Sequence, residues 1–394
     1  MSGGPTRVRL QSTPMLCRRT GPQVPTRCQL SVTPPGLAPR VWDQRTGWWS
    51  IIRGVSVPDL PFLHNASLYA SGSRALAELL AWGVATYGWT RVWLPSYYCP
   101  DVPAAVADHV PRLQLLAYPD SDLDAPPALA SIPAAPGDVV VVANQLGVRP
   151  RPVSAVTSGV TLIEDHSHDL GSDWALGSRA EYAFASLRKT LPLPDGGAVW
   201  SPLGLALPPE PTSADASLAP GLADALQRRA DRSRTASGDL PFRALARSAL
   251  ARSGRVAPGA MSPVSRALLP GMPMTVWRDA RRRNFEFLAG AVPLPDGVRL
   301  LLPPPGCVPF AYTVVFDDPA ERGRALQTLA GQGVTPAVLW PLDPALHTWA
   351  MAADADLSTR ILSIHCDQRY TEADMRHLAA VVREALLPCP SART

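Results

Sequence analysis

A single lysine stands out among the side chains of this sequence that could do chemistry. Of the 37 basic residues, Lys189 is the only lysine and the rest are arginine. A guanidinium stays protonated, whereas a desolvated lysine amine can lose its proton and form an imine with a carbonyl carbon. Codon bias also replaces lysine by arginine wherever only charge is needed, so composition alone leaves both explanations open. Lys189 predicts amine chemistry only together with its neighbours.

Small polar residues lie where they could hold a phosphate near this amine. Ser186 precedes Lys189 in the run Ser186-Leu187-Arg188-Lys189, so its hydroxyl could bind a phosphate while the amine reaches an aldehyde on the same molecule. Much earlier in the chain, Gly72 and Ser73 directly precede a helical pattern. Free N–H groups and the helix dipole favour an anion there, although an ordinary helix cap has the same composition.

Other polar and aromatic residues follow predicted strands. Asp165 and His168 come directly after the apolar run 160–164. A carboxylate at the end of a buried strand needs a cationic or N–H partner, and a protonated pyridine nitrogen is one such partner. A capping role explains Asp165 equally well, and His168 could either bind a ring hydroxyl or be satisfied within the fold. Tyr97 and Tyr98 follow another strand; either one could stack on a ring, and core packing is the alternative for both.

The elements that must position these residues alternate between short apolar runs and helical stretches. Such alternation predicts an α/β fold with a mainly parallel sheet covered on both faces, which binds ligands beyond the carboxyl ends of its strands. A smaller α/β unit begins near Pro309. In the large unit we expect a helix over 75–85 and strands over 91–94, 138–143, 160–164, 180–185 and 197–200. A helix over 277–288 follows, and the small unit is predicted to contain strands over 312–316, 334–339 and 360–364 and helices over 319–331 and 371–386.

The order and spacing of these pieces resemble those of the DegT/DnrJ/StrS aminotransferases, a family of fold-type I enzymes that depend on pyridoxal 5′-phosphate (PLP). The resemblance spans roughly residues 65–387 and is loosest over 203–270. It rests on the segments SGSRALAELL, LPSYYCPDV, LIEDHSHDLG, SLRKTLPLPDGGAV and ILSIHCDQRYTEADM.

This resemblance implies a seven-stranded-type sheet between helices, a small C-terminal α/β domain and a homodimer with active sites at the subunit interface. It makes Lys189 the residue that holds PLP as a Schiff base and Asp165 the partner of the pyridine nitrogen. His168 falls beside the ring hydroxyl. The phosphate contacts that it implies are Gly72, Ser73 and Ser186.

The sequence departs from the family in two places. The usual aromatic stacking position falls on Cys99, which leaves Tyr97 or Tyr98 to supply the ring. Asn144 opens a segment where the family more often has a histidine, and it is a candidate for binding substrate. Arg369 is a candidate for the donor's carboxylate, because a guanidinium fork matches that group; a surface arginine is the alternative.

Composition and segment boundaries complete the prediction. Residues 1–60 form an N-terminal arm, 61–270 the large PLP-binding domain and 271–394 the small domain. The net charge of +4 and the lack of a basic stripe give no reason to expect nucleic acid, and no apolar run is long enough to cross a membrane. Six scattered cysteines indicate a reducing compartment and no zinc site. Because no apolar run suits a secretory signal, we expect a cytoplasmic protein.

The predicted function is a PLP-dependent aminotransferase that acts on a biosynthetic intermediate, an amino-sugar or other natural-product precursor, with an amino-acid donor. One alternative keeps PLP but makes the enzyme a lyase or a β-replacement or elimination enzyme, because the outcome depends on which bond at the substrate α-carbon lies perpendicular to the ring. A second alternative is a non-catalytic scaffold or regulator with the same fold.

Overall fold

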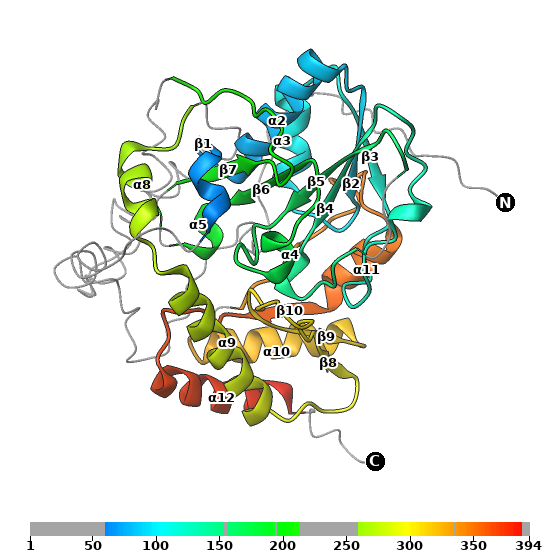
Figure 1. The fold of residues 1–394 in the computed structure, drawn as a ribbon. Helices are drawn as coiled ribbons and strands as arrows, with labels where there is room; N and C mark the ends of the chain where they lie inside the picture. Colours follow the sequence, from blue (N-terminus) through cyan, green and yellow to red (C-terminus); the bar gives the residue numbers. More distant parts are fainter. Residues whose placement is uncertain are drawn as a thin grey trace, which may run out of the picture.

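The structure is a computed structural model that describes residues 60–152, 157–191, 193, 195–212, 259–334 and 336–387. Within these residues the chain forms a seven-stranded sheet and a separate three-stranded sheet. In the view of Figure 1, the small sheet and its helices lie beneath the large sheet. The predicted arm over 1–60 lies outside the described residues except for Leu60, and so do residues 213–258 of the predicted large domain.

The large sheet is mainly parallel, as predicted. Its strand order is β1-β7-β6-β5-β4-β2-β3, and only β7 runs antiparallel to its neighbours β1 and β6. The sequence prediction omitted β1 and β3. The strands are β1 (Ser67–Tyr69), β2 (Arg91–Pro95), β3 (Gln114–Tyr118), β4 (Val139–Ala143), β5 (Thr161–Asp165), β6 (Tyr182–Ser186) and β7 (Gly197–Trp200).

Helices cover both faces of this sheet, which explains why its central strands are apolar without interruption. Side chains alternate between the two faces of a strand. Val141 of β4 packs in one cluster with residues of helices α2 (Gly72–Tyr87) and α3 (Asp101–His109). Val140 and Val142 pack on the opposite face with Trp174 of the short helix α4 (Asp173–Leu176).

The smaller unit is an antiparallel sheet, ordered β10-β9-β8, with helices packed on it. Its strand expected over 334–339 does not form: the described residues of that segment contribute one isolated bridge between Ala337 and Ser363. The expected helix start at Thr371 is confirmed, because Thr371 and Asp374 form a capping box. The elements are α9 (Met274–Ala291), β8 (Val298–Leu300), β9 (Tyr312–Phe316), α10 (Pro319–Gly331), α11 (Ala352–Arg360), β10 (Ile361–Ile364) and α12 (Glu372–Leu386).

Short elements complete the described chain. None of its described helices is long and apolar enough to span a bilayer. The short elements are η1 (Pro61–Asn65), η2 (Leu129–Ser131), η3 (Gln145–Gly147), α5 (Leu187–Thr190), α8 (Pro263–Leu268) and η4 (Leu269–Gly271).

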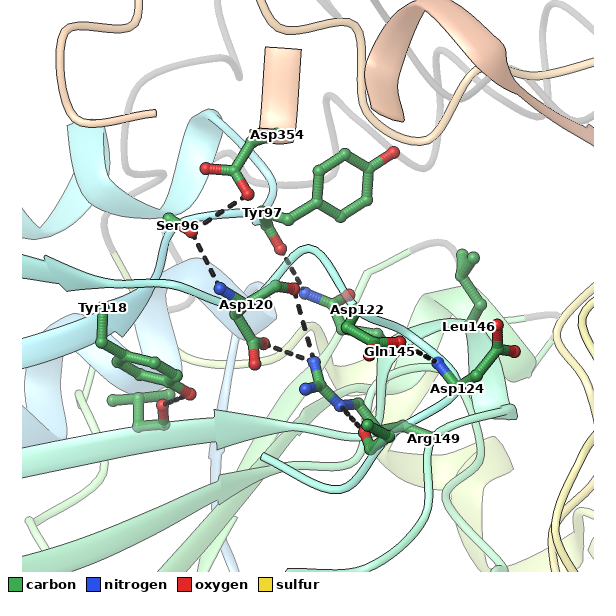
Figure 2. Close-up of polar contacts among 12 residues, drawn as sticks. Ser96, Tyr97, Tyr118, Asp120, Asp122, Asp124, Gln145, Leu146, Arg149 and Asp354 are labelled. Atoms are coloured by element: carbon green, nitrogen blue, oxygen red, sulfur yellow. Dashed lines mark hydrogen bonds and ion pairs between the residues drawn. The ribbon is translucent and has the colours of Figure 1, made fainter. Parts of the chain in front are cut away.

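Buried hydrogen bonds join the two units at the end of β2. The Ser96 hydroxyl accepts a bond from the backbone N–H of Asp120 and donates to Asp354 at the start of α11, each at 3.0 Å (Figure 2). The backbone N–H of Trp340 donates to the Tyr97 hydroxyl at 2.8 Å, and that hydroxyl donates to the Leu339 carbonyl. Because these groups are buried, each bond avoids a costly unsatisfied polar atom. The end of β2 is therefore held against the smaller unit.

Glycine at position 197 lets helix α2 begin close to the large sheet. A Cβ at Gly197 would lie 2.1 Å from the Ser71 carbonyl oxygen and 2.7 Å from the Gly72 nitrogen. Both atoms belong to the backbone, so neither can move aside as a flexible side chain would.

We expect Gly197→Ala to lower the free energy of unfolding by about 1–3 kcal/mol, because overpacking forces the backbone apart. The matched control is Gly323→Ala in α10, where an added Cβ meets nothing within 4 Å. That control should raise stability by roughly 0.5–1 kcal/mol, the helix-propensity difference between the two residues. Thermal melting of both variants checks this. Equal melting temperatures for Gly197→Ala and the unchanged protein would contradict the tight contact.

Candidate active site

Parallel pairing places the predicted polar residues side by side at one edge of the large sheet. Ala143 pairs with Asp165 and Asp165 with Phe184, so β4, β5 and β6 end close together. The first turn of α2 lies against the same edge, since a Cβ at Gly72 would lie 2.7 Å from the Ser186 Cβ. Residues far apart in the sequence therefore meet where a ligand of an open α/β sheet is expected.

Asp165 is a buried carboxylate with two hydrogen-bond donors. Its Oδ1 accepts from the Ser167 N–H at 2.8 Å, and its Oδ2 accepts from the Tyr98 hydroxyl at 2.5 Å. Burial and the neighbouring Asp165 raise the pKa of Tyr98 well above its usual value, so the hydroxyl keeps its proton and acts as donor. These two bonds fix the carboxylate at the end of β5, and each of its oxygens retains a free lone pair.

Lys189 lies in α5, directly after β6, and its amine faces His168. The Lys189 Nζ and His168 Nε2 atoms are 3.1 Å apart, and the Nζ lies 4.9 Å from the ring centroid of Trp340. His168 Nδ1 accepts a hydrogen bond from the Leu146 N–H at 3.0 Å. Burial, with the nearby charges of Lys189 and Arg281, lowers the pKa of His168 well below its usual value.

These contacts determine the tautomer of His168. A neutral imidazole whose Nδ1 accepts has its proton on Nε2. The Nε2–H group of His168 then donates toward Lys189 Nζ, so the contact is a hydrogen bond when the amine is unprotonated and offers its lone pair. The sequence suggested that His168 binds a cofactor hydroxyl; in the structure its Nε2 faces the amine.

The two candidate tyrosines lie on different sides of the site. The Tyr98 ring belongs to the core cluster of α2 and the sheet, and the Tyr97 ring packs with residues of the smaller unit. The ring beside the Lys189 amine is that of Trp340, which is also stacked with His168 at 5.8 Å between centroids. Cofactor stacking by either tyrosine stays a prediction. Sequence reasoning missed Trp340, because no local pattern ties position 340 to position 189.

The two candidate substrate-binding residues have different surroundings. Asn144 is 1% exposed, and its backbone N–H donates to the Asp165 carbonyl at 3.0 Å. Its side-chain amide lies near the Cys307 thiol and has no other hydrogen-bond partner among the described residues. The Arg369 guanidinium instead forks onto Asp367, with N–O distances of 2.7 and 2.6 Å. That ion pair neutralises Arg369, so the fork proposed for a donor carboxylate is already occupied.

The residues present fit PLP in charge and hydrogen-bonding capacity. The Gly72 and Ser73 N–H groups belong to the first turn of α2, where no intrahelical acceptor exists, and they can bind a phosphate. A Cβ at position 72 would collide with Ser186, so glycine is needed for α2 to begin beside the end of β6. Asp165 can accept from a pyridine N–H group, and the Lys189 amine lies at the same edge of the sheet.

Comparisons with known proteins establish the fold. No family model and no curated protein matches the sequence. Solved structures do match. One is a DegT DnrJ EryC1 StrS aminotransferase from Brucella abortus, which has 18% sequence identity to this chain and a TM-score of 0.52; the match covers 81% of this chain and 85% of that one. TlmJ, an aminotransferase from Streptoalloteichus hindustanus, gives 18% identity over 82% and 85% of the chains with a TM-score of 0.54. The sugar aminotransferase CalS13 from Micromonospora echinospora has 14% sequence identity over 85% of this chain and 95% of that one, with a TM-score of 0.53. The chain therefore has the fold of the fold-type I PLP aminotransferases.

His168 predicts how stability depends on pH. Because folding lowers its pKa, the unfolded chain takes up a proton below about pH 6.5 that the folded protein excludes. Stability is therefore lost as pH falls, by at most about 1.4 kcal/mol per pH unit from this residue. We expect the melting temperature of His168→Gln to fall less between pH 7 and pH 5 than that of the unchanged protein. His64→Gln, at an exposed site, is the control, and parallel curves for all three proteins would disprove the assignment.

Proposed function

We propose that this protein is a PLP-dependent aminotransferase that transfers an amino group from an amino-acid donor to a small biosynthetic intermediate. The observation that supports this most strongly is the position of Lys189. Its amine lies at the carboxyl edge of a fold-type I sheet, where β5 ends in the buried Asp165 and the first turn of α2 approaches Ser186. A lysine, a strand-end carboxylate and a phosphate-binding helix start are the parts that PLP chemistry requires.

The cofactor would be held at three points. The Gly72 and Ser73 N–H groups and the Ser186 hydroxyl bind its phosphate. The Asp165 carboxylate accepts the hydrogen bond of the protonated ring nitrogen, and Ser167 and Tyr98 fix the orientation of that carboxylate. When bound, PLP supplies an aldehyde carbon that accepts amines and a cationic ring that withdraws electrons from the substrate α-carbon.

Lys189 has two functions in this proposal. At rest its Nζ would hold the cofactor, and when released from it the free Nζ would accept the proton that leaves the donor α-carbon and hand it on within the site. The amine must be neutral to accept this proton. The His168 Nε2–H group, 3.1 Å away, donates to the lone pair of the neutral amine and keeps it positioned between transfers.

The substrate class is proposed from the resemblance and from the structural neighbours. CalS13 is a sugar aminotransferase, DesI was solved with its TDP-sugar product, and another neighbour is 3-amino-5-hydroxybenzoic acid synthase. These facts support an amino-sugar or other natural-product precursor as the acceptor. The resemblance also supports a homodimer with its active sites at the subunit interface, and light scattering on the purified protein tests the dimer. The scattered cysteines support a cytoplasmic location.

Borohydride reduction of the purified protein tests the cofactor assignment. We expect loss of the visible absorbance and a phosphopyridoxyl label on Lys189, found by peptide mapping. The chain offers no other lysine side chain, so the label has one possible side-chain destination. Lys189→Arg, which keeps the charge, should abolish both label and turnover, because a guanidinium cannot form the bond. An unlabelled wild-type protein, or an active Lys189→Arg variant, would refute the proposal.

A donor-only experiment separates transamination from lyase or replacement chemistry. With an amino-acid donor and no acceptor, an aminotransferase converts its cofactor to pyridoxamine phosphate, which accumulates in an amount equal to the active sites. A lyase or replacement enzyme releases product and regenerates the aldehyde form. Chromatography of the released cofactor distinguishes the two outcomes.

A further inference from the structure

A buried arginine lies beside the Lys189 site without a carboxylate partner among the residues that the structure describes. Arg281 is 5% exposed and lies on helix α9, one turn after Arg278. Arg278 forks onto Asp169, with N–O distances of 3.0 and 3.2 Å. The Nη2 of Arg281 donates only to the amide oxygen of Gln368, at 3.2 Å, and its Nε has no hydrogen-bond partner among the described residues.

Contacts on two sides connect this guanidinium to the Lys189 site. Gln368 also donates from its Nε2 to the carbonyl of Thr190, the residue after Lys189, at 3.2 Å. On the other side, Arg281 lies 5.8 Å from the ring centroid of Phe310, and that ring lies 4.8 Å from the His168 ring. Arg281 therefore belongs to the wall of the site that the smaller unit contributes.

The charge of Arg281 is poorly compensated. In the described part of the chain two carboxylates lie near it, but Asp367 binds Arg369 and Asp169 binds Arg278. Burial lowers the pKa of Arg281, and these two carboxylates only partly oppose that shift. A buried cation without a direct counter-ion is costly, so such a site favours an anion that supplies one. One guanidinium and one neutral amide suit a singly charged carboxylate better than a diphosphate, which has more charge to neutralise.

We propose that Arg281, oriented by Gln368, binds the carboxylate of the amino-acid donor whose nitrogen reaches the cofactor at Lys189. This inference rests on the proposed function and deepens it. It assigns to Arg281 the role that the sequence suggested for Arg369, whose guanidinium is engaged by Asp367. A fork held at a fixed distance from the amine would orient the donor α-carbon for proton transfer.

Two small probes test this without knowledge of the natural donor. Aminooxyacetate and methoxyamine attack the cofactor aldehyde through the same aminooxy nitrogen and release the Lys189 amine, but only aminooxyacetate has a carboxylate. The change in visible absorbance gives the rate constant of each. We expect the wild-type protein to prefer aminooxyacetate by at least about tenfold, the loss typical of removing a charge-assisted hydrogen bond.

The variants separate carboxylate binding from structural support. Arg281→Met should remove the preference and leave the methoxyamine rate unchanged, whereas Arg283→Met, at an exposed position of the same helix, should retain it. If Arg281→Met fails to fold, Arg281→Lys and Gln368→Leu give the same test, because each disturbs the fork and should reduce the preference.

Three results would overturn the assignment. A wild-type protein that does not distinguish the two probes, while Lys189 is still labelled by borohydride, overturns the carboxylate subsite alone. A preference that survives in Arg281→Met, with a lowered melting temperature, reduces Arg281 to a structural role. If neither probe reacts and Lys189 is also unlabelled, both the subsite and the proposed function are wrong.

Discussion

Parallel pairing of β4, β5 and β6 is the constraint on which the rest of the site depends. Parallel strands have the same direction, so their carboxyl ends meet at one edge and the residues that follow them become neighbours. Asp165 pairs with Ala143 on one side and Phe184 on the other. This register brings Asn144 and Ser186 to the same edge as Asp165, although long crossovers separate them in sequence. A shift by one residue would turn Asp165 to the other face of the sheet.

The second determinant is how the buried charges near this edge are distributed. Asp169 and Asp367 each have an arginine fork, and Asp165 has a tyrosine hydroxyl and a backbone N–H group. In a region of low dielectric constant, removing one partner from such a pair is costly because it leaves a buried charge uncompensated. Within the described ranges Arg281 has only a neutral amide as partner, and this poorly compensated charge makes it the candidate anion site.

The smaller unit completes the site through residues that lie outside its regular strands. Trp340 and Phe310 flank His168, and the Tyr97 hydroxyl accepts a hydrogen bond from the Trp340 backbone. The bond from Ser96 to Asp354 holds the start of α11 beside the same strand end (Figure 2). The large sheet therefore positions the amine and the carboxylate, whereas the smaller unit forms the wall that faces them.

The sequence by itself determined the fold class and was sufficient to nominate the residues of the candidate site. The apolar runs of β4 and β5, the Ser186–Lys189 spacing and the lone lysine are local features, and local periodicity and residue chemistry are sufficient to interpret them. The tertiary structure decided which side chains meet. It placed Trp340 rather than a tyrosine beside Lys189, joined Tyr98 to Asp165, and paired Arg369 with Asp367, while no described carboxylate pairs directly with Arg281. These contacts join loops and helices far apart in the chain, and long-range packing, which leaves no periodic trace in the sequence, determines them.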